Sequence, residues 1–133
     1  MEASGGRLTP FKPFADDDGI DLLIFDKITR RAMPLQVKAR RNYDHETGRR
    51  VQFNVRVKTL SETGGDILLV KLDGLHIEAT WLIPAAELRG VALAKGEHLV
   101  CVPSAKPTSS DRFTPYRKGT MADVVAAILA RGA

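Results

Sequence analysis

The sequence offers little material for disulfides, zinc sites or membrane anchors. Its single cysteine, Cys101, excludes a disulfide within the chain. Its three histidines, His45, His76 and His98, do not have the spacing of a zinc-ligand motif. No segment approaches the roughly 18 consecutive apolar residues that a membrane-spanning helix requires. A disulfide scaffold, a zinc module and a membrane-spanning protein are therefore not expected.

The short motifs of nucleotide-binding and serine-hydrolase sites are also missing. The chain has no P-loop, no glycine-rich dinucleotide fingerprint and no Gly-x-Ser-x-Gly sequence. Aromatic residues make up only 6% of the chain, which argues against a base-stacking surface for single-stranded nucleic acid. Trp81 and Cys101 both lie in apolar stretches, so we expect them to be core residues.

The composition that is present suits one soluble folded domain. A hydrophobic fraction of 44% over 133 residues is ordinary for a packed core, so we expect a single domain over residues 1–133. Residues 1–18 contain glycine, proline and an aspartate run without a helical or strand period, which predicts an irregular N-terminal segment. The N-terminus also lacks the apolar stretch of a signal peptide, so a cytoplasmic location and no membrane partner are expected.

Hydrophobic patterning predicts a mixed, largely antiparallel sheet with a helix packed on it, in the α+β or mixed α/β class. Apolar runs and alternating patterns predict strands at residues 20–26, 32–39, 51–58, 67–72, 76–83 and 97–102. Pro84 fits the start of a short helix that ends near Leu88. Apolar residues at helical spacing predict a C-terminal helix that Thr120 caps and Gly132 ends.

Positive charge is concentrated in one part of the chain. Residues 27–58 hold ten of the twenty lysines and arginines but only two of the sixteen acids. Such a stretch is the footprint expected for a polyanionic ligand, and the alternative is solubilising charge on turns and exposed strand faces. Within it, Arg40, Arg41 and Arg56 are the expected nucleic-acid phosphate contacts.

The first two predicted strands would form a hairpin that gathers three polar side chains around one point. Asp21 opens the first strand, and Gln36 and Lys38 share one face of the second. A carboxylate can hold Mg²⁺ beside a phosphodiester, and an ammonium can stabilise the charge that develops during hydrolysis. Gln36 and the backbone carbonyl of Val37 offer further oxygen ligands. Asp26 is expected to start the turn instead of binding metal.

Gly19-Ile20-Asp21, the apolar strand after it and Gln36-Val37-Lys38-Ala39-Arg40 resemble the PD-(D/E)XK, or restriction-endonuclease-like, nuclease superfamily. The likeness covers about residues 16–90 and is to the group that includes archaeal Holliday junction resolvases and group I intron homing endonucleases. It implies a mixed β-sheet flanked by helices. The helix that usually precedes the first strand in that superfamily is not predicted in residues 1–18.

The resemblance implies a Mg²⁺-dependent (or Mn²⁺-dependent) DNA endonuclease that hydrolyses phosphodiester bonds. Asp21 would bind the metal and Lys38 would assist the attacking water. Gln36 stands where the superfamily usually has Glu or Asp, with Gln a known variant. DNA is the implied partner, and a homodimer would suit a nuclease that cuts both strands.

Two other hypotheses remain open from the sequence. The chain could be a catalytically inactive DNA-binding module that keeps the fold and the basic face, which Gln36 and the missing helix favour. It could also be a structural or protein-interaction module that dimerises through the strand edge at residues 51–58.

Overall fold

The computed structural model of the chain describes residues 5–6, 8–11, 22–42, 51–57, 65–73, 76–105 and 110–132. Its main sheet has six strands, with one parallel pair between β3 and β5 and antiparallel neighbours elsewhere. In spatial order the strands are β1 (Leu8–Phe11), β2 (Leu22–Asp26), β3 (Ala32–Asn42), β5 (Asp66–Asp73), β6 (His76–Pro84) and β9 (Arg117–Lys118).

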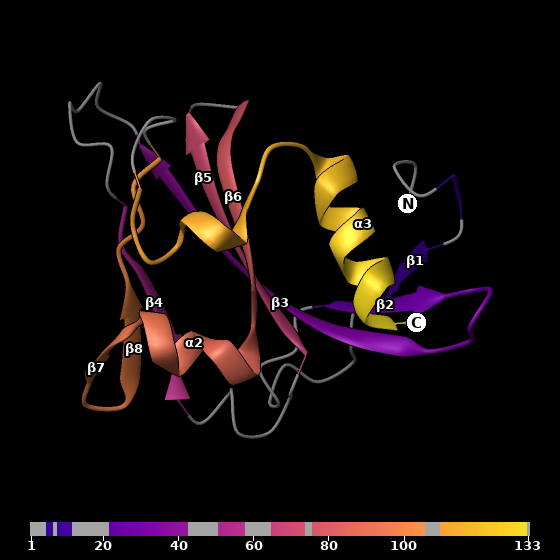
Figure 1. Cartoon of the computed structure of the whole chain (residues 1–133), viewed down its shortest axis with the longest axis horizontal. Helices are drawn as coiled ribbons and strands as arrows, with labels where there is room; N and C mark the ends of the chain where they lie inside the picture. The colour runs from indigo at the N-terminus through magenta and orange to yellow at the C-terminus, as the bar shows by residue number, and fades with distance from the viewer. Residues whose placement is uncertain are drawn as a thin grey trace.

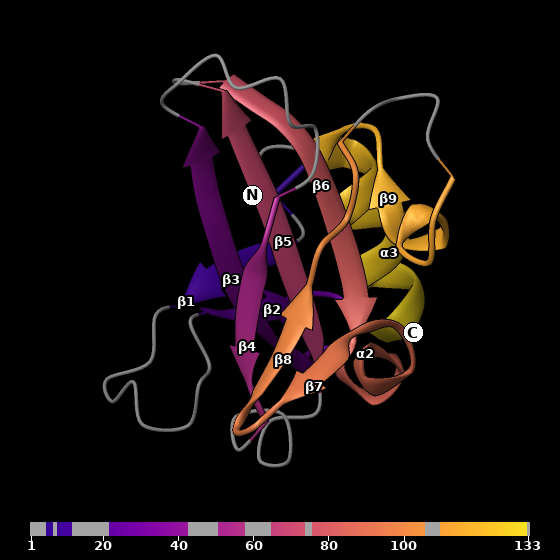
Figure 2. The ribbon, with the colours of Figure 1, turned by 90° about the vertical axis from the view of Figure 1, so that its left-hand side faces the viewer.

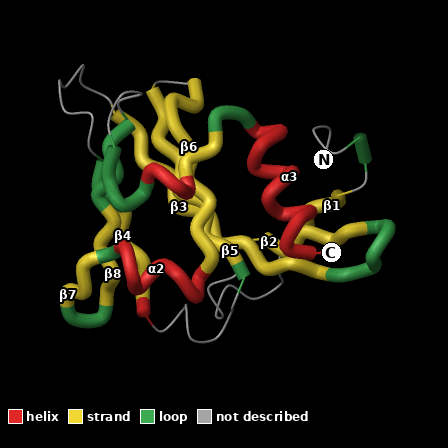
Figure 3. Tube along the Cα trace, viewed as in Figure 1, coloured by secondary structure: helices red, strands yellow, loops and turns green. Residues whose placement is uncertain are grey.

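A second, three-stranded antiparallel sheet packs on one face of the main sheet. Its order is β4 (Phe53–Arg56), β8 (His98–Cys101) and β7 (Leu93–Lys95). Helix α3 (Met121–Gly132) covers the opposite face, so the molecule has three layers with the main sheet in the middle (Figures 1 and 2). The short helix α2 (Ala85–Val91) follows β6, and a 3₁₀ turn, η2 (Thr114–Tyr116), precedes β9 (Figure 3).

The main sheet is apolar on both faces, which explains why its central strands read as near-continuous hydrophobic runs. Along β5, Ile67 and Leu69 pack against the three-stranded sheet, while Leu68 and Val70 pack under α3. Burial of each such side chain contributes about 1.5–3 kcal/mol. Trp81 and Cys101, both nearly inaccessible to solvent, belong to the cluster between the sheets, as the sequence predicted.

The predicted fold class and most predicted elements are confirmed. The strands expected at 20–26, 32–39, 51–58, 67–72, 76–83 and 97–102 correspond to β2, β3, β4, β5, β6 and β8, and the predicted C-terminal helix is α3. The pattern Val-Gln-Phe-Asn-Val-Arg at the start of residues 51–58 alternates between buried and exposed positions over β4, as expected.

The prediction that residues 1–18 are irregular is wrong at residues 8–11, which form β1. This strand is short and contains Pro10, so it carries no periodic signal. It lies at the edge of the sheet, which is where a strand can accommodate proline. In the described part of residues 1–21, namely 5–6 and 8–11, there is no helix, and residues 12–21 lie outside the described ranges.

Two further short strands were not predicted. β7 has three residues, all exposed, and so shows no buried face to detect. β9 has two residues and lies within residues 103–119, a stretch that contains three prolines. Both pair with longer strands. Their conformation therefore depends on hydrogen bonds to the neighbouring strand and not on a pattern in their own residues.

Candidate functional site

Strand β3 separates the candidate residues from the core side chains by simple alternation. Leu35 and Val37 contribute to the cluster under α3. Gln36 and Lys38 therefore lie on the other face of the strand. In the parallel register with β5, Gln36 is beside Ile67 and Lys38 is beside Leu69, so both sit next to the apolar cluster between the sheets. The sequence-predicted placement of Gln36 and Lys38 on one face is thus what the backbone register gives.

Gln36 is buried, with only 6% of its surface exposed. Its side-chain oxygen, Oε1, is inaccessible to solvent and has no hydrogen-bond partner within the described ranges of the chain. A buried acceptor in this state costs about 1–3 kcal/mol relative to a satisfied one. Such groups are uncommon in folded proteins, and binding of an ion or a water is one of their ordinary explanations.

Exposure increases along this face of β3. Gln36 is buried, Lys38 is half-buried and Arg40 is exposed. This face of β3 therefore changes from the buried amide of Gln36 to the solvent-exposed guanidinium of Arg40, with the Lys38 ammonium between them. An anion that approached from solvent would meet positive charge before it reached the buried oxygen.

The beginning of β5 is held close to β3 by a glycine. Gly65 has a φ of +65°, and a Cβ at this position would lie 2.5 Å from the carbonyl oxygen of Pro34. The carbonyl of Gly65 also accepts a hydrogen bond of 2.9 Å from the N–H of Ala85 at the start of α2. The close approach of Gly65 to Pro34 fixes the register of β3 and β5 two residues before Gln36.

An ion pair between β5 and β6 lies farther along the main sheet. Lys71, which pairs with Arg40 in the parallel register, is 2% exposed, and its Nζ lies 2.6 Å from Oε2 of Glu78. The register between β5 and β6 shifts at Lys71 and Leu72, leaving Glu78 as the extra residue of a bulge. This pair was not predicted from the sequence, although a lysine within the apolar run Ile-Leu-Leu-Val-Lys-Leu was a usable signal.

The remaining predicted site residues have different outcomes. Asp21 lies outside the described residues, and Leu22, which follows it, pairs with Leu35. Arg41 belongs to β3, but its side chain is not described. Arg56 is exposed on β4 in the other sheet, opposite His98 of β8. The structure thus brings Gln36, Lys38 and Arg40 onto one strand and leaves Arg56 on a separate one.

Asp26 starts the turn between β2 and β3, as predicted. Its side chain is fully buried. Oδ1 accepts a hydrogen bond of 3.0 Å from the N–H of Ile28, and Oδ2 accepts one of 2.9 Å from the hydroxyl of Thr29. The carboxylate is therefore engaged in the turn and is not offered to a metal.

A metal centre built wholly from side-chain carboxylates, thiolates and imidazoles is not found in the described ranges. No group of three or more His, Cys, Asp or Glu residues there could hold an ion. Burial raises the pKa of the Cys101 thiol to about 11, so this cysteine is neither a ready metal ligand nor a nucleophile. Any ion near Gln36 would have to draw on amide and carbonyl oxygens, water and residues outside the described ranges.

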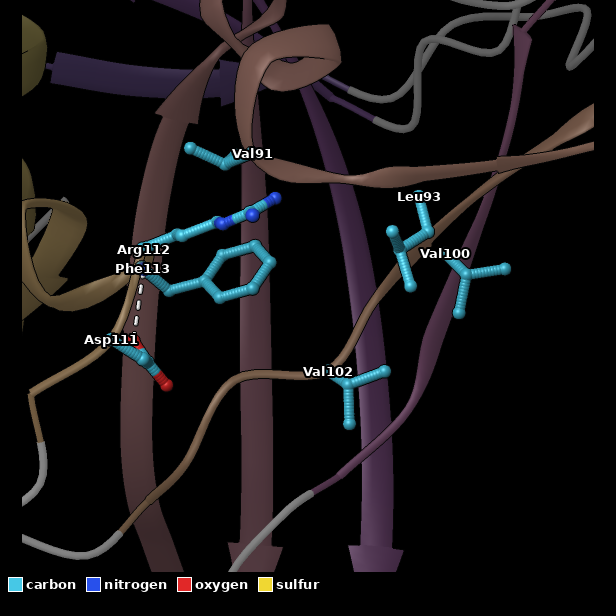
Figure 4. A pocket seen from close by; sticks show the side chains of 7 residues that line it. All are labelled: Val91, Leu93, Val100, Val102, Asp111, Arg112 and Phe113. Atoms are coloured by element: carbon cyan, nitrogen blue, oxygen red, sulfur yellow. Dashed lines mark hydrogen bonds between the residues drawn. The ribbon is translucent and has the colours of Figure 1, made fainter.

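A cavity of about 340 Å³ lies elsewhere, between the second sheet and the segment before η2 (Figure 4). Its lining is largely apolar and includes no residue of β3. The lining residues are Val91, Leu93, Val100, Val102, Asp111, Arg112 and Phe113. The Asp111 carboxylate accepts hydrogen bonds from the N–H groups of Ser104 and Phe113, at 3.0 and 2.9 Å, so it serves the loop. This cavity lacks the converging charges that a phosphate would need.

No helix in the described part of the chain combines the length and the hydropathy that crossing a bilayer would take.

Comparison with known proteins shows the fold. No protein-family model matches the chain, and no curated protein matches its sequence. The bacterial homing endonuclease I-Ssp6803I has a similar structure, with a TM-score of 0.56 and 19% sequence identity over 99% of this chain and 83% of that one. The Holliday junction resolvase Hjc of Archaeoglobus fulgidus gives a TM-score of 0.49 and 9% identity over 94% of each chain. The predicted likeness to the restriction-endonuclease-like nucleases is therefore confirmed at the level of the fold.

Proposed function

We propose that this chain, acting as a single nuclease-like domain over residues 1–133, is a metal-dependent DNA endonuclease that hydrolyses phosphodiester bonds. The proposal assigns the chemistry to Asp21, Gln36 and Lys38. The observation that carries it is the buried, unpartnered Oε1 of Gln36 beside Lys38 on one face of β3. The fold that surrounds this strand is similar to that of a homing endonuclease.

Asp21, which directly precedes β2 in the sequence, is the third residue of the proposed site. Leu22 pairs with Leu35 in the antiparallel register of β2 and β3, and Asp21 precedes Leu22 as Gln36 follows Leu35. The proposal requires Asp21 to lie opposite Gln36, one residue beyond the pair of Leu22 and Leu35. The pair would then offer one carboxylate and one neutral oxygen on the same face.

The donor set suits Mg²⁺ or Mn²⁺ better than zinc. Mg²⁺ prefers oxygen ligands, retains several waters and is commonly held by one or two carboxylates, so it does not need a cluster of three acids. Asp21 and the Oε1 of Gln36 would hold the ion. The carbonyl of Val37 would be a third ligand, because a carbonyl oxygen has two lone pairs and can serve a strand and an ion together. A divalent cation in this place supplies charge neutralisation on the phosphate and activation of water.

Lys38 has two roles available in this arrangement. Its half-buried ammonium would stabilise negative charge that develops on the phosphate, and it would orient a water for attack. Arg40, Arg41 and Arg56 would contact neighbouring phosphates of the DNA. Each contact of this kind strengthens binding in a salt-dependent way without reading sequence.

Cleavage of supercoiled plasmid DNA in Mg²⁺ or Mn²⁺ tests the assignment. We expect Asp21→Ala and Lys38→Ala to lose about 10²-fold or more in rate, since each removes a group that acts on developing charge. Arg56→Gln is a matched control, because it removes one exposed charge outside β3 and should weaken binding modestly. Full cleavage by either Asp21→Ala or Lys38→Ala would show that the roles are wrongly assigned.

A catalytically inactive DNA-binding or protein-interaction module is the second candidate. The observation that favours it is Gln36 itself, because an amide removes one negative charge from a site that would attract a cation. This candidate expects salt-dependent DNA binding, or binding to a protein, with no cleavage in any divalent metal. An inactive module should also gain no cleavage activity from Gln36→Glu. A catalytic site that uses the Gln36 amide should instead change its cleavage rate when that residue becomes glutamate.

A homodimer would let the same site cut both strands of a duplex. Strand β4, which contains residues 53–56 of the predicted interaction edge, is an outer strand of the second sheet in the described part of the chain. Sedimentation equilibrium of the wild type and of Asn54→Pro, which blocks strand addition at this edge, would test that arrangement.

A further inference from the structure

The turn that joins β2 and β3 has an unusual surface for a hairpin end. We call residues 27–31 the hairpin tip. Its sequence is Lys-Ile-Thr-Arg-Arg, and the side chains of Lys27, Arg30 and Arg31 are exposed. Ile28 is 70% exposed, more than Ile77 or Leu93, the other large apolar side chains exposed in the described ranges. The hairpin extends away from the rest of the sheet, beyond the C-terminal end of α3 (Figure 1).

The hairpin tip is held in one shape by Asp26. Both oxygens of its buried carboxylate accept hydrogen bonds from the tip, from the Ile28 N–H and the Thr29 hydroxyl. Its carbonyl accepts a hydrogen bond of 2.7 Å from the N–H of Arg30, and its N–H donates one of 2.9 Å to the carbonyl of Arg31. A turn fixed in this way loses little conformational freedom when it binds a partner.

Arg30 adds a sign of constraint. Its φ is +61°, and it is the one residue other than glycine with positive φ in the described ranges. The left-handed conformation costs a non-glycine residue about 1–2 kcal/mol. Glycine would remove that cost. The arginine side chain is therefore present at a position where the backbone conformation alone would favour glycine. Strained positions of this kind tend to occur where a side chain serves binding.

The charges around Ile28 identify the kind of partner. The acid of this turn, Asp26, is buried and engaged, so the exposed charge of the tip is positive. A bare apolar patch would suit a protein surface. An apolar side chain between cations suits a polyanion that has an apolar interior, and DNA is such a ligand, since proteins insert isoleucine or leucine between base steps from the minor groove while cations hold the phosphates.

We propose that the hairpin tip is a second DNA contact, in which Ile28 enters the minor groove of a duplex and Lys27 and Arg30 bind the flanking phosphates. The proposal deepens the proposed function and rests on its DNA-binding part. It does not depend on cleavage.

The length of β3 sets where this contact falls. Arg31 directly precedes β3, and Lys38 lies seven residues after it, which corresponds to about 23 Å at roughly 3.3 Å per residue. That distance spans about six to seven base pairs at roughly 3.4 Å per step. The tip would therefore touch the duplex more than half a helical turn from the phosphate at Lys38, and would orient the protein on the DNA.

Binding to a fluorescent duplex, measured in EDTA over a series of salt concentrations, tests the proposal without cleavage. Lys27→Gln and Arg30→Gly should each lower the slope of log K against log salt by about 0.9, the value for one phosphate contact. Arg30→Gly removes the charge while relieving the backbone, so loss of folding cannot explain its effect. Ile28→Ser should weaken binding by about five- to thirty-fold without changing the slope.

Matched controls lie on other surfaces. Ile77→Ser removes another exposed isoleucine, and Lys95→Gln removes an exposed charge from β7. Both should bind DNA like the wild type in affinity and slope. Tip variants that behave like these controls would overturn the hairpin proposal while leaving DNA binding and cleavage at β3 intact. A wild type that binds no duplex at low salt, about 50 mM, would also overturn it.

Crosslinking places the contact directly. Cys101 is buried, so Ile28→Cys would give the protein one accessible thiol among the described residues, which can carry a photoactivated crosslinker. We expect crosslinks to one position on the duplex, about six to seven base pairs from the site of cleavage. Yields no higher than those of Ile77→Cys would contradict the proposal. Tip-dependent binding without metal-dependent cleavage would support the hairpin contact and count against the proposed hydrolysis.

Discussion

Gln36 joins two properties that rarely occur together in a core position. It is buried next to an apolar cluster, and its acceptor oxygen has no partner in the described part of the chain. A side chain selected only for stability at this place would be apolar, because replacing a poorly satisfied buried amide by a group of the same shape is neutral or stabilising. The proposed metal ion would give the Gln36 oxygen the partner that the described residues do not supply.

We expect Gln36→Met to raise the stability of the fold and to weaken metal binding. Methionine is unbranched and fills a similar volume, so the free energy of unfolding should rise by about 1–2 kcal/mol when the unpartnered oxygen is removed. Urea unfolding at constant m-value measures this change. Affinity for Mn²⁺ should fall in the same variant. A large loss of stability would instead indicate that the Oε1 has a structural partner.

Cys101 gives a second prediction at the scale of one residue. Burial raises the pKa of its thiol from 9.0 to about 11. Between these values the unfolded chain releases the thiol proton and the folded chain keeps it, so the unfolded state binds fewer protons and stability falls as pH rises. The stabilising contribution is complete below about pH 9, and about 2–3 kcal/mol should be lost by pH 11.

Denaturant unfolding of the wild type and Cys101→Ala between about pH 8 and pH 11 checks this sign. The variant should be less stable at neutral pH and should show a smaller decline. Burial and a hydrogen bond with Glu87 also raise the pKa of Tyr116, which acts in the same direction, so both proteins should carry Tyr116→Phe. Parallel pH profiles would show that the Cys101 thiol does not contribute.

At the scale of elements, the site depends on the parallel contact between β3 and β5. The start of β5 approaches Pro34 through Gly65, whose positive φ and close packing both require glycine. Gly65→Ala should therefore cost roughly 2–4 kcal/mol, from the left-handed conformation and from the displaced Pro34 backbone. Thermal unfolding measures the loss. Gly90→Ala is the matched control, since Gly90 lies in α2 with open space around it. This substitution should leave the free energy of unfolding unchanged or raise it.

The elements that the sequence predicted well are those with strong periods. β2, β5 and β6 are largely apolar runs, β3 alternates between apolar and polar residues from Leu35 to Arg40, and the stripe of Val124, Val125 and Ile128 marks α3. β1, β7 and β9 escaped prediction because they are short edge or near-edge segments whose hydrogen bonds come from a longer neighbour. Sequence patterns record which residues are buried in a strand, and neither β7 nor β9 has a fully buried residue.

At the scale of the whole molecule, three layers set the limits of the site. α3 covers one face of the main sheet and the three-stranded sheet covers the other (Figure 2). Gln36 of β3 therefore lies in the middle layer, while Arg40 and the cations of the hairpin tip are exposed to solvent. The sequence predicted the shared face of Gln36 and Lys38 from alternation alone. It did not reveal that Gln36 is buried and unpartnered, because burial depends on the packing of the second sheet, which no local pattern encodes.

The most direct test of the central claim is calorimetric titration of Mn²⁺ into the protein bound to a short DNA duplex, for the wild type and Asp21→Ala. We expect the wild type to bind the ion, and we expect the variant, with the proposed carboxylate removed, to lose most of that affinity while remaining folded and bound to DNA. Equal binding by both proteins, or no binding by either, would contradict a metal site formed by Asp21 and Gln36 at the hairpin of β2 and β3.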